Sequence, residues 1–457
     1  MPDGALKFTV VAPRGAARLT EAALAVAASV LLALPALWNG FPLLEYDTGG
    51  YLARWYEGYL VPSRPAPYGL LLNLGSLLDF WPVVALQCAL TVWVVTLTMR
   101  SHGLQPRPLT RLAIFIMLAL ATTLPWIASV LLTDIFIGLA VLGLYLMIFR
   151  AGDLDRIERT ALIVIIALAA ATHSASLLLV IALGTLAAAG AWLWPALVPR
   201  AALKPVTSAI VLGFVILLAG NFVVTKRLAW TPGGYGIVFG RLLEDGVVNR
   251  YLDDHCGQRQ FKLCAVRNTL PRNADVFLWG DETFNRLGRF DGLGAEMRTI
   301  VLESLADYPL ENIWLAIRAA ARQMVSVRTG EGVLDSIWHT YGMIEDHTPW
   351  NVPAMRAARQ QHSLLHFDGI NRLHVPVALF SMLMLLAPLL LALRRRRTDS
   401  ITPLAASVTL AILVNAAILG PLSNPHDRYG ARIVWLAPLV VALWLTQRRE
   451  TETRHEK

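Results

Sequence analysis

Charge and cysteine are both scarce in this sequence. Of its 457 residues, 16% are charged, 56% are hydrophobic and 3 are cysteine. Soluble domains carry about 25% charged residues, so the shortage of charge excludes an ordinary soluble protein. Long apolar runs recur along most of the chain, which indicates a polytopic helical membrane protein.

Several sequence signals are missing. No A-x-A-like site follows the first apolar segment, so we expect a retained span there and no cleavable signal peptide. The stretch TPGGYG at 231–236 has no strand before it and no GKS or GKT after it, which favours a linker over a phosphate loop. No persuasive internal repeat of the kind common in transporters is present. The net charge of +8 lies mostly beside apolar segments, which predicts contact with membrane lipid and no nucleic-acid partner.

The apolar runs predict an all-α fold with about ten transmembrane helices. A helix that crosses a bilayer needs about 20 residues. The expected spans are 19–38, 81–99, 111–124, 127–149, 160–172, 175–194, 206–225, 374–393, 401–419 and 431–447. The segments 111–124 and 160–172 are short, and each joins its successor through a tight break, so each could instead belong to a re-entrant hairpin.

Basic residues gather in alternate connections between these spans. One set holds most of them: Lys7, Arg14, Arg18, Arg100, Arg107, Arg111, Arg150, Arg156, Arg159, Arg200, Lys204 and the arginines at 394–397. The opposite short connections hold little beyond Arg54, Arg64, Arg428 and Arg432. The positive-inside rule therefore places both termini in the cytoplasm.

A long polar segment divides the chain into three expected parts. Residues 1–226 form a seven-span membrane core with an acidic first outer loop. Residues 227–373 are rich in Asp, Glu, Arg, Asn and Trp, and the helical spacing of apolar residues at 294–307 and 309–327 predicts a small helical periplasmic domain lying against the membrane. Residues 374–457 form a three-span segment with a cytoplasmic tail.

We expect different roles for the three cysteines. Cys88 lies in an apolar run and is expected to be an inert packing residue. Cys256 and Cys264 lie in DDHCGQRQFKLCAVR, in the long outer segment, where an oxidising compartment would make them a disulfide candidate. A metal site that includes His255 is the alternative, but CxxC spacing and a clear fourth ligand are missing.

Polar residues from distant parts of the sequence return to the outer ends of the spans. The first outer loop, NGFPLLEYDTGGYL, carries Glu45 and Asp47, and charge at such a position is costly unless it has water, a partner or a function. The others are Arg64, Asp134, His173, His426, Asp427, Arg428 and Tyr429. Acids, a histidine and an arginine gathered on one face are what a reaction at the lipid–water boundary would need.

Each of these residues also has a structural explanation. The acidic pair could belong to a solvated loop, or Asp47 could cap the helix that follows. Asp134 could form a buried salt bridge, and His173 could be a hydrogen-bonded structural histidine. Arg428 could anchor the chain at the membrane interface, and Arg64 could be an ordinary loop residue.

The layout resembles the GT-C superfamily of polyprenyl-phosphate-sugar-dependent membrane glycosyltransferases. Members are polytopic and carry an acidic motif, often DxD or ExD, in the first outer loop. Here Glu45-Tyr46-Asp47 is ExD directly after the first span. Seven spans precede the long outer segment, as in many members, and Arg428-Tyr429 in HDRYGARIVWLAPL resembles RY-containing segments late in some bacterial members. The resemblance implies an enzyme of the bacterial inner membrane.

The resemblance implies transfer of a sugar from a polyprenyl-phosphate donor to an envelope glycan, lipid or protein acceptor at the periplasmic face. Asp47 would take a proton from the acceptor hydroxyl, with Glu45 assisting or orienting, and Arg428 would neutralise the leaving phosphate. The residues expected to bind or position substrate are Tyr429, His426, Asp427, Asp134, His173 and Arg64. Some members use a divalent cation near the acidic motif, so Glu45 and Asp47 could hold Mg²⁺ or Mn²⁺.

Three other functions stay open at the level of sequence. A transporter or lipid flippase would also place charged residues at membrane depth. A ligase or polymerase that moves whole lipid-linked glycans would share the topology. A non-catalytic scaffold for envelope assembly would tolerate the neutral replacements Asp47→Asn and Glu45→Gln.

Overall fold

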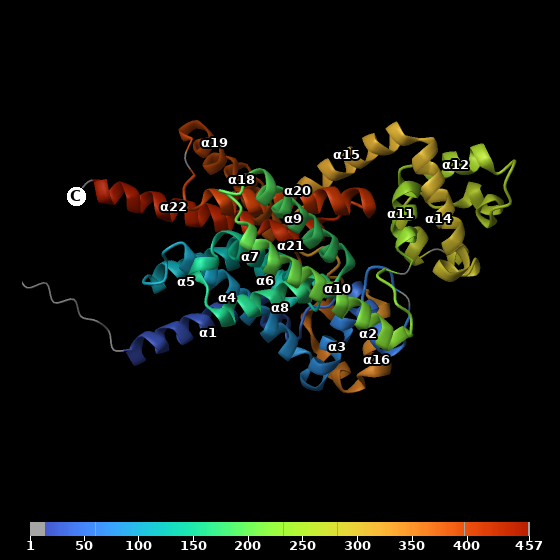
Figure 1. Cartoon of the computed structure of the whole chain (residues 1–457). Helices are drawn as coiled ribbons and strands as arrows, with labels where there is room; N and C mark the ends of the chain where they lie inside the picture. Colours follow the sequence, from blue (N-terminus) through green and yellow to red (C-terminus); the bar gives the residue numbers. More distant parts are fainter. Residues whose placement is uncertain (1–13, 60, 232, 281, 397, 456–457) are drawn as a thin grey trace, which may run out of the picture.

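The computed structural model describes residues 14–455, except for 60, 232, 281 and 397. The model is 79% helical, and the described residues contain no strand beyond an isolated parallel bridge between Leu43 and Val130. The helices form a large body and a smaller lobe beside one end of it (Figure 1). The expected all-α class is confirmed.

Among the described residues, seven helical segments are long and apolar enough to cross a membrane. They are formed by α1 (Arg14–Asn39), α4 (Trp81–Ser101), α9 (Ser174–Leu193), α10 (Leu203–Thr225), α18 with α19 (Asp368–Met384, Leu386–Arg395), α20 (Thr402–Leu422) and α21 with α22 (Asp427–Val434, Leu436–His455). Their length and composition indicate a multi-pass membrane protein.

Two further expected spans correspond to shorter helices. The segment expected at 111–124 is α5 (Pro108–Ala121), of 14 residues, and the segment expected at 160–172 is α8 (Arg156–Thr172), of 17 residues. Both are shorter than the length of about 20 residues that crosses a bilayer without adjustment. That all ten expected segments cross the membrane stays a prediction.

The segment expected as one span at 127–149 is divided. It forms α6 (Leu124–Ser129) and α7 (Asp134–Phe149). The chain between them is extended at Val130 because Leu43 pairs with it through flanking backbone hydrogen bonds of 3.0 and 2.9 Å. Irregular backbone is tolerated inside a membrane protein when other parts of the chain satisfy its polar groups, as Leu43 does here.

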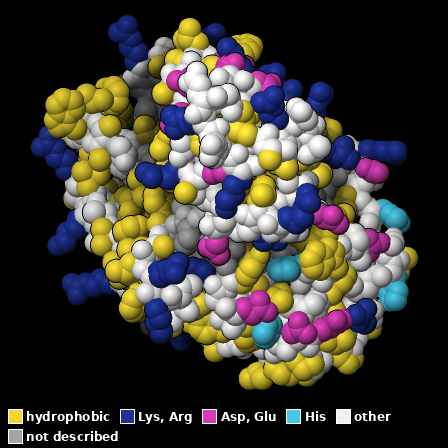
Figure 2. All heavy atoms as spheres, turned by 90° about the vertical axis from the view of Figure 1, so that its right-hand side faces the viewer, with side chains coloured by type: hydrophobic (Ala, Val, Ile, Leu, Met, Phe, Trp, Pro, Cys, Tyr) yellow, Lys and Arg dark blue, Asp and Glu magenta, His cyan; other side chains and the backbone are white. Residues whose placement is uncertain are grey.

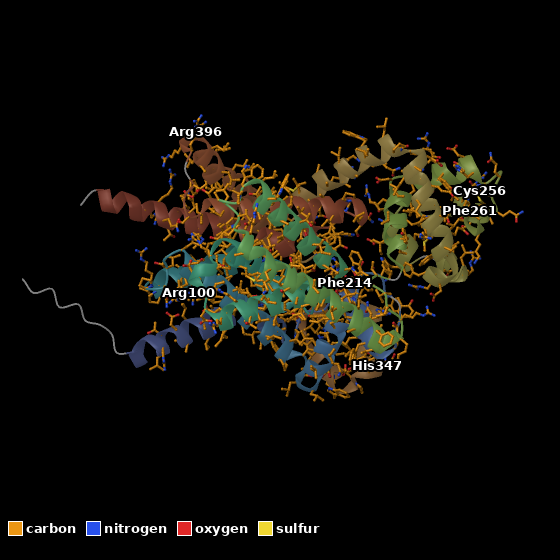
Figure 3. The ribbon with its side chains drawn as sticks, viewed as in Figure 1. Arg100, Phe214, Cys256, Phe261, His347 and Arg396 are labelled. Atoms are coloured by element: carbon orange, nitrogen blue, oxygen red, sulfur yellow. A yellow bond between two sulfur atoms is a disulfide. The ribbon has the colours of Figure 1, made fainter. Side chains whose placement is uncertain are left out.

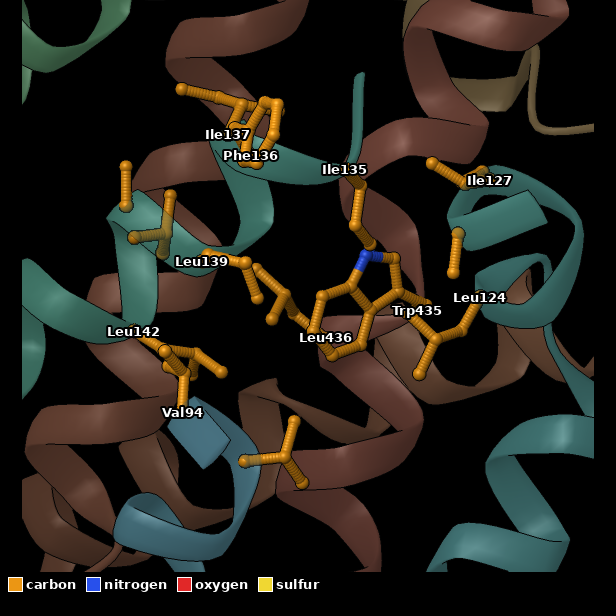
Figure 4. Packing of buried hydrophobic residues seen from close by; sticks show 14 of the residues in the cluster. Val94, Leu124, Ile127, Ile135, Phe136, Ile137, Leu139, Leu142, Trp435 and Leu436 are labelled. Carbon is orange, nitrogen blue, oxygen red and sulfur yellow. The ribbon is translucent and has the colours of Figure 1, made fainter. Parts of the chain in front are cut away.

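The centre of the body is α7, whose residues from Asp134 to Ile148 are all buried. Trp435 packs beside it among Leu124, Ile127 and Ile135 (Figure 4). Gly138 permits this contact, since a Cβ there would lie 2.7 Å from the Trp435 ring. The close approach holds α7 against the end of α21 and fixes the position of Asp134.

The residues expected to form one outer segment lie in two places. The first part is the lobe, with its own apolar core around Phe239, Phe277 and Leu293. Its helices are α11 (Gly234–Glu244), α12 (Val247–His255), α13 (Glu282–Arg286) and α14 (Arg289–Asp307). Cys256 and Cys264, the disulfide candidates, are joined by a disulfide on this lobe.

The second part returns to the body. It contains α15 (Pro309–Val325), which lies against α20, and α16 (Trp338–His347), which lies against α2 (Tyr46–Tyr56). It also contains the short helix α17 (Val352–Ala357), whereas the short helix α3 (Ala66–Gly75) follows α2 in the first outer loop. Gln360 ties this part to the acidic loop: its amide accepts from the Leu44 N–H at 3.0 Å and donates to the Leu44 carbonyl at 2.7 Å, although 316 positions separate the two residues.

Labelled residues mark the two ends of the molecule. Arg100 and Arg396 lie at one end, from which α1 begins and at which α22 ends, whereas Cys256 and His347 lie at the other (Figures 1 and 3). Figure 2 looks onto this second end, the lobe end, where acidic and histidine side chains gather among arginines. Arginines at the far end are what the positive-inside rule requires of a cytoplasmic face. The membrane orientation itself stays a prediction.

Candidate functional site

The acidic motif lies at the start of α2, where its backbone is held from two sides. The Glu45 N–H donates to the Thr48 hydroxyl at 3.2 Å, and the Thr340 hydroxyl of α16 donates to the Glu45 carbonyl at 2.7 Å. Gly49 lets the two helices approach, since a Cβ there would lie 2.7 Å from the Thr340 Cα. The two carboxylates are therefore presented by a fixed backbone.

Arg428, from the start of α21, binds both acids of the motif. Its Nη1 donates to Glu45 Oε1 and Oε2 at 2.6 and 2.5 Å, and its Nη2 donates to Asp47 Oδ2 at 2.6 Å. Arg64 forms a second ion pair with Asp47. We call these four residues the charge cluster; their side chains are 4–17% exposed and their formal charges balance.

The two acids of the charge cluster differ in their proton affinity. Burial raises the pKa of Asp47, but the guanidinium groups of Arg428 and Arg64 lower it by more, so this pKa lies well below its usual range. Burial raises the pKa of Glu45 to about 7, with a contribution from the charge of Asp47, despite the opposing effect of Arg428. Asp47 is therefore ionised at neutral pH, whereas Glu45 can gain or lose a proton there.

Glu45 and Arg428 also line a cavity of about 40 Å³, which is room for a few water molecules. Asp134 and Glu331 add acidic groups to its lining. The rest of the wall is largely apolar and includes Trp126, Ile127, Val130, Leu132, Val333 and Ala431. The lining is therefore charged at one end and apolar along the rest of its wall.

Asp134 belongs to a second buried ion pair. Its Oδ1 lies 3.5 Å from Nη1 of Arg432, which is 1% exposed. Arg432 also donates from Nε and Nη2 to Asn415 Oδ1, at 3.1 and 2.8 Å. This is the salt bridge that the sequence offers as the alternative for Asp134. The sequence did not single out Arg432 as a site residue. The signal that could have found it is its spacing, because a residue four positions after Arg428 lies on the same face of a helix.

Glu331 is a site residue that the sequence alone did not single out. Its Oε1 lies 2.9 Å from His426 Nδ1, and its Oε2 accepts from the Arg428 N–H at 2.8 Å. Burial lowers the pKa of His426, but the hydrogen bond and charge of Glu331 raise it overall, to about 9. His426 is therefore a cation at neutral pH and holds the turn before α21 against Glu331.

Two glycines flank Glu331 and offer a sequence signal for it. Gly330 and Gly332 have φ angles of +93° and +82°, which glycine adopts far more readily than other residues. A Cβ on Gly332 would lie 2.0 Å from Glu45 Oε1. An acid between two glycines, in a turn that follows an amphipathic helix, is the pattern that could have marked this position.

Comparisons with protein-family models, curated proteins and solved structures found no match.

The remaining candidates have identified partners. His173 precedes α9, and its Nδ1 accepts a backbone hydrogen bond of 3.2 Å from the first turn of that helix, which is a structural role. Asp427 Oδ1 accepts from the Arg328 N–H at 3.0 Å. The Tyr429 ring lies 5.0 Å from the guanidinium carbon of Arg428. Of these three residues, Tyr429 touches the charge cluster.

The charge cluster does not fit a divalent cation. Glu45 and Asp47, the suggested ligands for Mg²⁺ or Mn²⁺, both face guanidinium groups, and a metal ion between them would be repelled by Arg428 and Arg64. Within the described part of the chain, no group of three or more His, Cys, Asp or Glu residues is placed to hold a metal.

Proposed function

We propose that the chain is a glycosyltransferase that moves a sugar from a polyprenyl-phosphate donor to an acceptor hydroxyl at the lobe end of the membrane body. The charge cluster carries this proposal, because it joins the first outer loop to the last membrane segment beside a largely apolar cavity wall. Ionisable groups buried at a membrane boundary are expensive and usually functional. The resemblance to the GT-C superfamily supports the same activity.

The reaction is a displacement at the anomeric carbon of the donor sugar. The acceptor hydroxyl gives its proton to a carboxylate, and its oxygen forms a bond to the anomeric carbon. The bond between that carbon and the phosphate oxygen breaks, and the electron pair leaves with polyprenyl phosphate. Arg428 neutralises the charge of the departing phosphate through paired N–H donors.

We assign the role of base to Glu45, whereas the sequence favours Asp47. Glu45 lines the cavity, and its pKa of about 7 suits a base at neutral pH. Asp47 stays ionised between Arg64 and Arg428. In this assignment Asp47 orients Arg428, and Glu45 accepts the proton.

In this proposal, binding of the donor frees Glu45 from Arg428 so that Glu45 can act as the base. Arg428 Nη1 donates to Glu45 in the structure, so a donor phosphate has to compete for that guanidinium. When the phosphate takes the N–H donors, Glu45 is freed to face the acceptor. The base therefore becomes available once the donor is bound.

A donor panel tests the proposal. Purified protein in lipid nanodiscs is incubated with polyprenyl-phosphate sugars, and the release of polyprenyl phosphate is measured beside an Arg428→Gln control. We expect the wild type to consume at least one donor and the control to consume none. Including lipid-linked oligosaccharides separates transfer of one sugar from transfer of whole glycans. Movement of intact donor across vesicles, without cleavage, would favour a flippase instead.

A further inference from the structure

An exposed apolar stripe runs the length of α15. Its members Leu310, Ile313, Trp314, Ile317 and Val325 are 56–81% exposed, and their helical spacing places them on one face. The opposite face is buried and contains Asn312, Leu315, Ala319 and Gln323. A contiguous apolar surface of this kind marks a site of interaction.

The buried face of α15 packs along α20. A Cβ on Gly420, near the end of α20, would lie 2.7 Å from the backbone carbonyl of Ala319. One turn further along α15, Met324 lines a small cavity together with Ile412. Because α20 extends from Thr402 to Leu422, Ile412 lies at its middle. The end of α15 therefore lies beside the interior of a helix long enough to span a membrane.

The neighbouring surface of α20 indicates what covers the stripe. Leu410 and Leu413 of α20 are 43% and 47% exposed, and acyl chains are the solvent for such side chains on a membrane span. The stripe continues this lipid-facing surface onto the adjacent helix. Arg322 is exposed beside it, and arginine side chains at membrane edges extend toward lipid headgroups. Arg318, also beside the stripe, pairs with Asp245 of the lobe at 3.2 Å.

We propose that α15 is a membrane-inserted half helix whose apolar stripe is covered by lipid acyl chains. It enters the leaflet at the lobe end and ends within it, and the turn that carries Glu331 then returns to the cavity beside the charge cluster. Glu311, Arg318 and Arg322 give α15 too much charge to be recognised as a span, which explains why its sequence predicts a place in the outer domain. This inference stands independently of the proposed reaction.

Single cysteine probes test the insertion of α15. Cys88 is buried and the other two cysteines are paired, so an introduced cysteine can be labelled with a fluorophore without a cysteine-free background. Ile317→Cys probes the stripe. Leu413→Cys on α20 is the lipid-facing control, and Val276→Cys on the lobe, 51% exposed, is the water-facing control. The labelled proteins are reconstituted in phosphatidylcholine vesicles and quenched either by nitroxide lipids or by aqueous iodide.

The label at 317 should be quenched by nitroxide lipids, as the label at 413 is, and weakly by iodide. The label at 276 should show the opposite behaviour. Quenching at 317 by iodide but not by lipid would overturn the proposal. Protection of 317 from both quenchers would also overturn it, because a protein surface such as a second copy of the chain would then cover the stripe.

A second pair of probes tests the direction of insertion. Leu310→Cys should be quenched most by nitroxide near the headgroup, and Val325→Cys most by nitroxide near the end of the acyl chain. Equal or reversed depth profiles would contradict a half helix that enters from the lobe end.

Discussion

The lobe and the charge cluster use the same chemical groups in different surroundings. In the lobe, Arg259 and Glu303 pair at 3.0 Å while 46% and 32% exposed. In the charge cluster, Arg428 and Glu45 pair at 2.5 Å while 17% and 4% exposed. Exposed pairs contribute about 0–1 kcal/mol, whereas removing one partner of a buried pair costs about 3–5 kcal/mol. Of these two pairs, Arg428 and Glu45 retain their charges against the larger desolvation penalty, and they do so beside a cavity.

The largest expected effect is on catalysis at Glu45. Glu45→Gln keeps the shape of the side chain but cannot accept the proton, so the transfer rate should fall by about 10²–10⁴-fold. The rate of polyprenyl phosphate release measures this change. Glu303→Gln, the matched replacement in the lobe, should leave the rate unchanged. A Glu45→Gln variant as active as the Glu303→Gln variant would remove Glu45 as the base.

Asp47→Asn should have the largest effect on stability. The replacement leaves two buried guanidinium groups with one acid, so the free energy of unfolding should fall by about 3–5 kcal/mol. Glu45→Gln should cost less, because Glu45 already gains a proton near pH 7. Thermal unfolding can be followed with a thiol-reactive dye, since Cys88 is buried and free in the folded chain. Equal melting temperatures for Asp47→Asn and Glu303→Gln would contradict the comparison.

Gly332→Ala should disturb the site through backbone strain. The added Cβ would lie 2.0 Å from Glu45 Oε1 at a φ angle of +82°, and strain of this kind costs about 1–3 kcal/mol. Both the melting temperature and the transfer rate should decrease. Gly152→Ala is the matched control, because a Cβ there meets open space and no positive φ is involved. Similar losses in the two variants would show that Gly332 is not sterically restricted.

The pH dependence of transfer should follow Glu45. The base must be ionised, and its pKa of about 7 in the folded protein means that kcat/KM increases as pH rises through neutrality. Below that pKa the rate should fall by about tenfold for each pH unit. A pH–rate profile that is flat across neutrality, or that falls with rising pH, is inconsistent with Glu45 as the base.

The smallest effect is expected in the lobe itself. Arg259→Gln removes one member of an exposed ion pair, so the free energy of unfolding should change by less than about 1 kcal/mol. The same thiol-reactive unfolding assay measures it. A loss as large as that of Asp47→Asn would mean that burial does not set the different contributions of the two ion pairs.

The sequence predicts the fold class and much of the site, for physical reasons that are clear. Apolar runs report membrane helices directly, and an acid beside a span is conspicuous because it is expensive. Arg428 and Glu45 are 383 positions apart in the sequence. Their proximity could be predicted only by combining the motif Glu45-Tyr46-Asp47 with the expected topology, which places both residues on one side of the membrane.

Other features could not be predicted because they depend on distant partners. The break before α7 arises from pairing with Leu43, and the different pKa values of Glu45 and Asp47 arise from burial and from the position of Arg64. Glu331 becomes a site residue only when α15 carries its turn back to α21.

A structure of the protein with a non-hydrolysable analogue of its donor tests the central claim most directly. We predict that Arg428 will donate to the phosphate oxygens, that Asp47 will keep its pair with Arg64, and that the Glu45 carboxylate will be released toward the anomeric carbon. A phosphate bound away from Arg428, with both acids still paired to that guanidinium, would contradict the account.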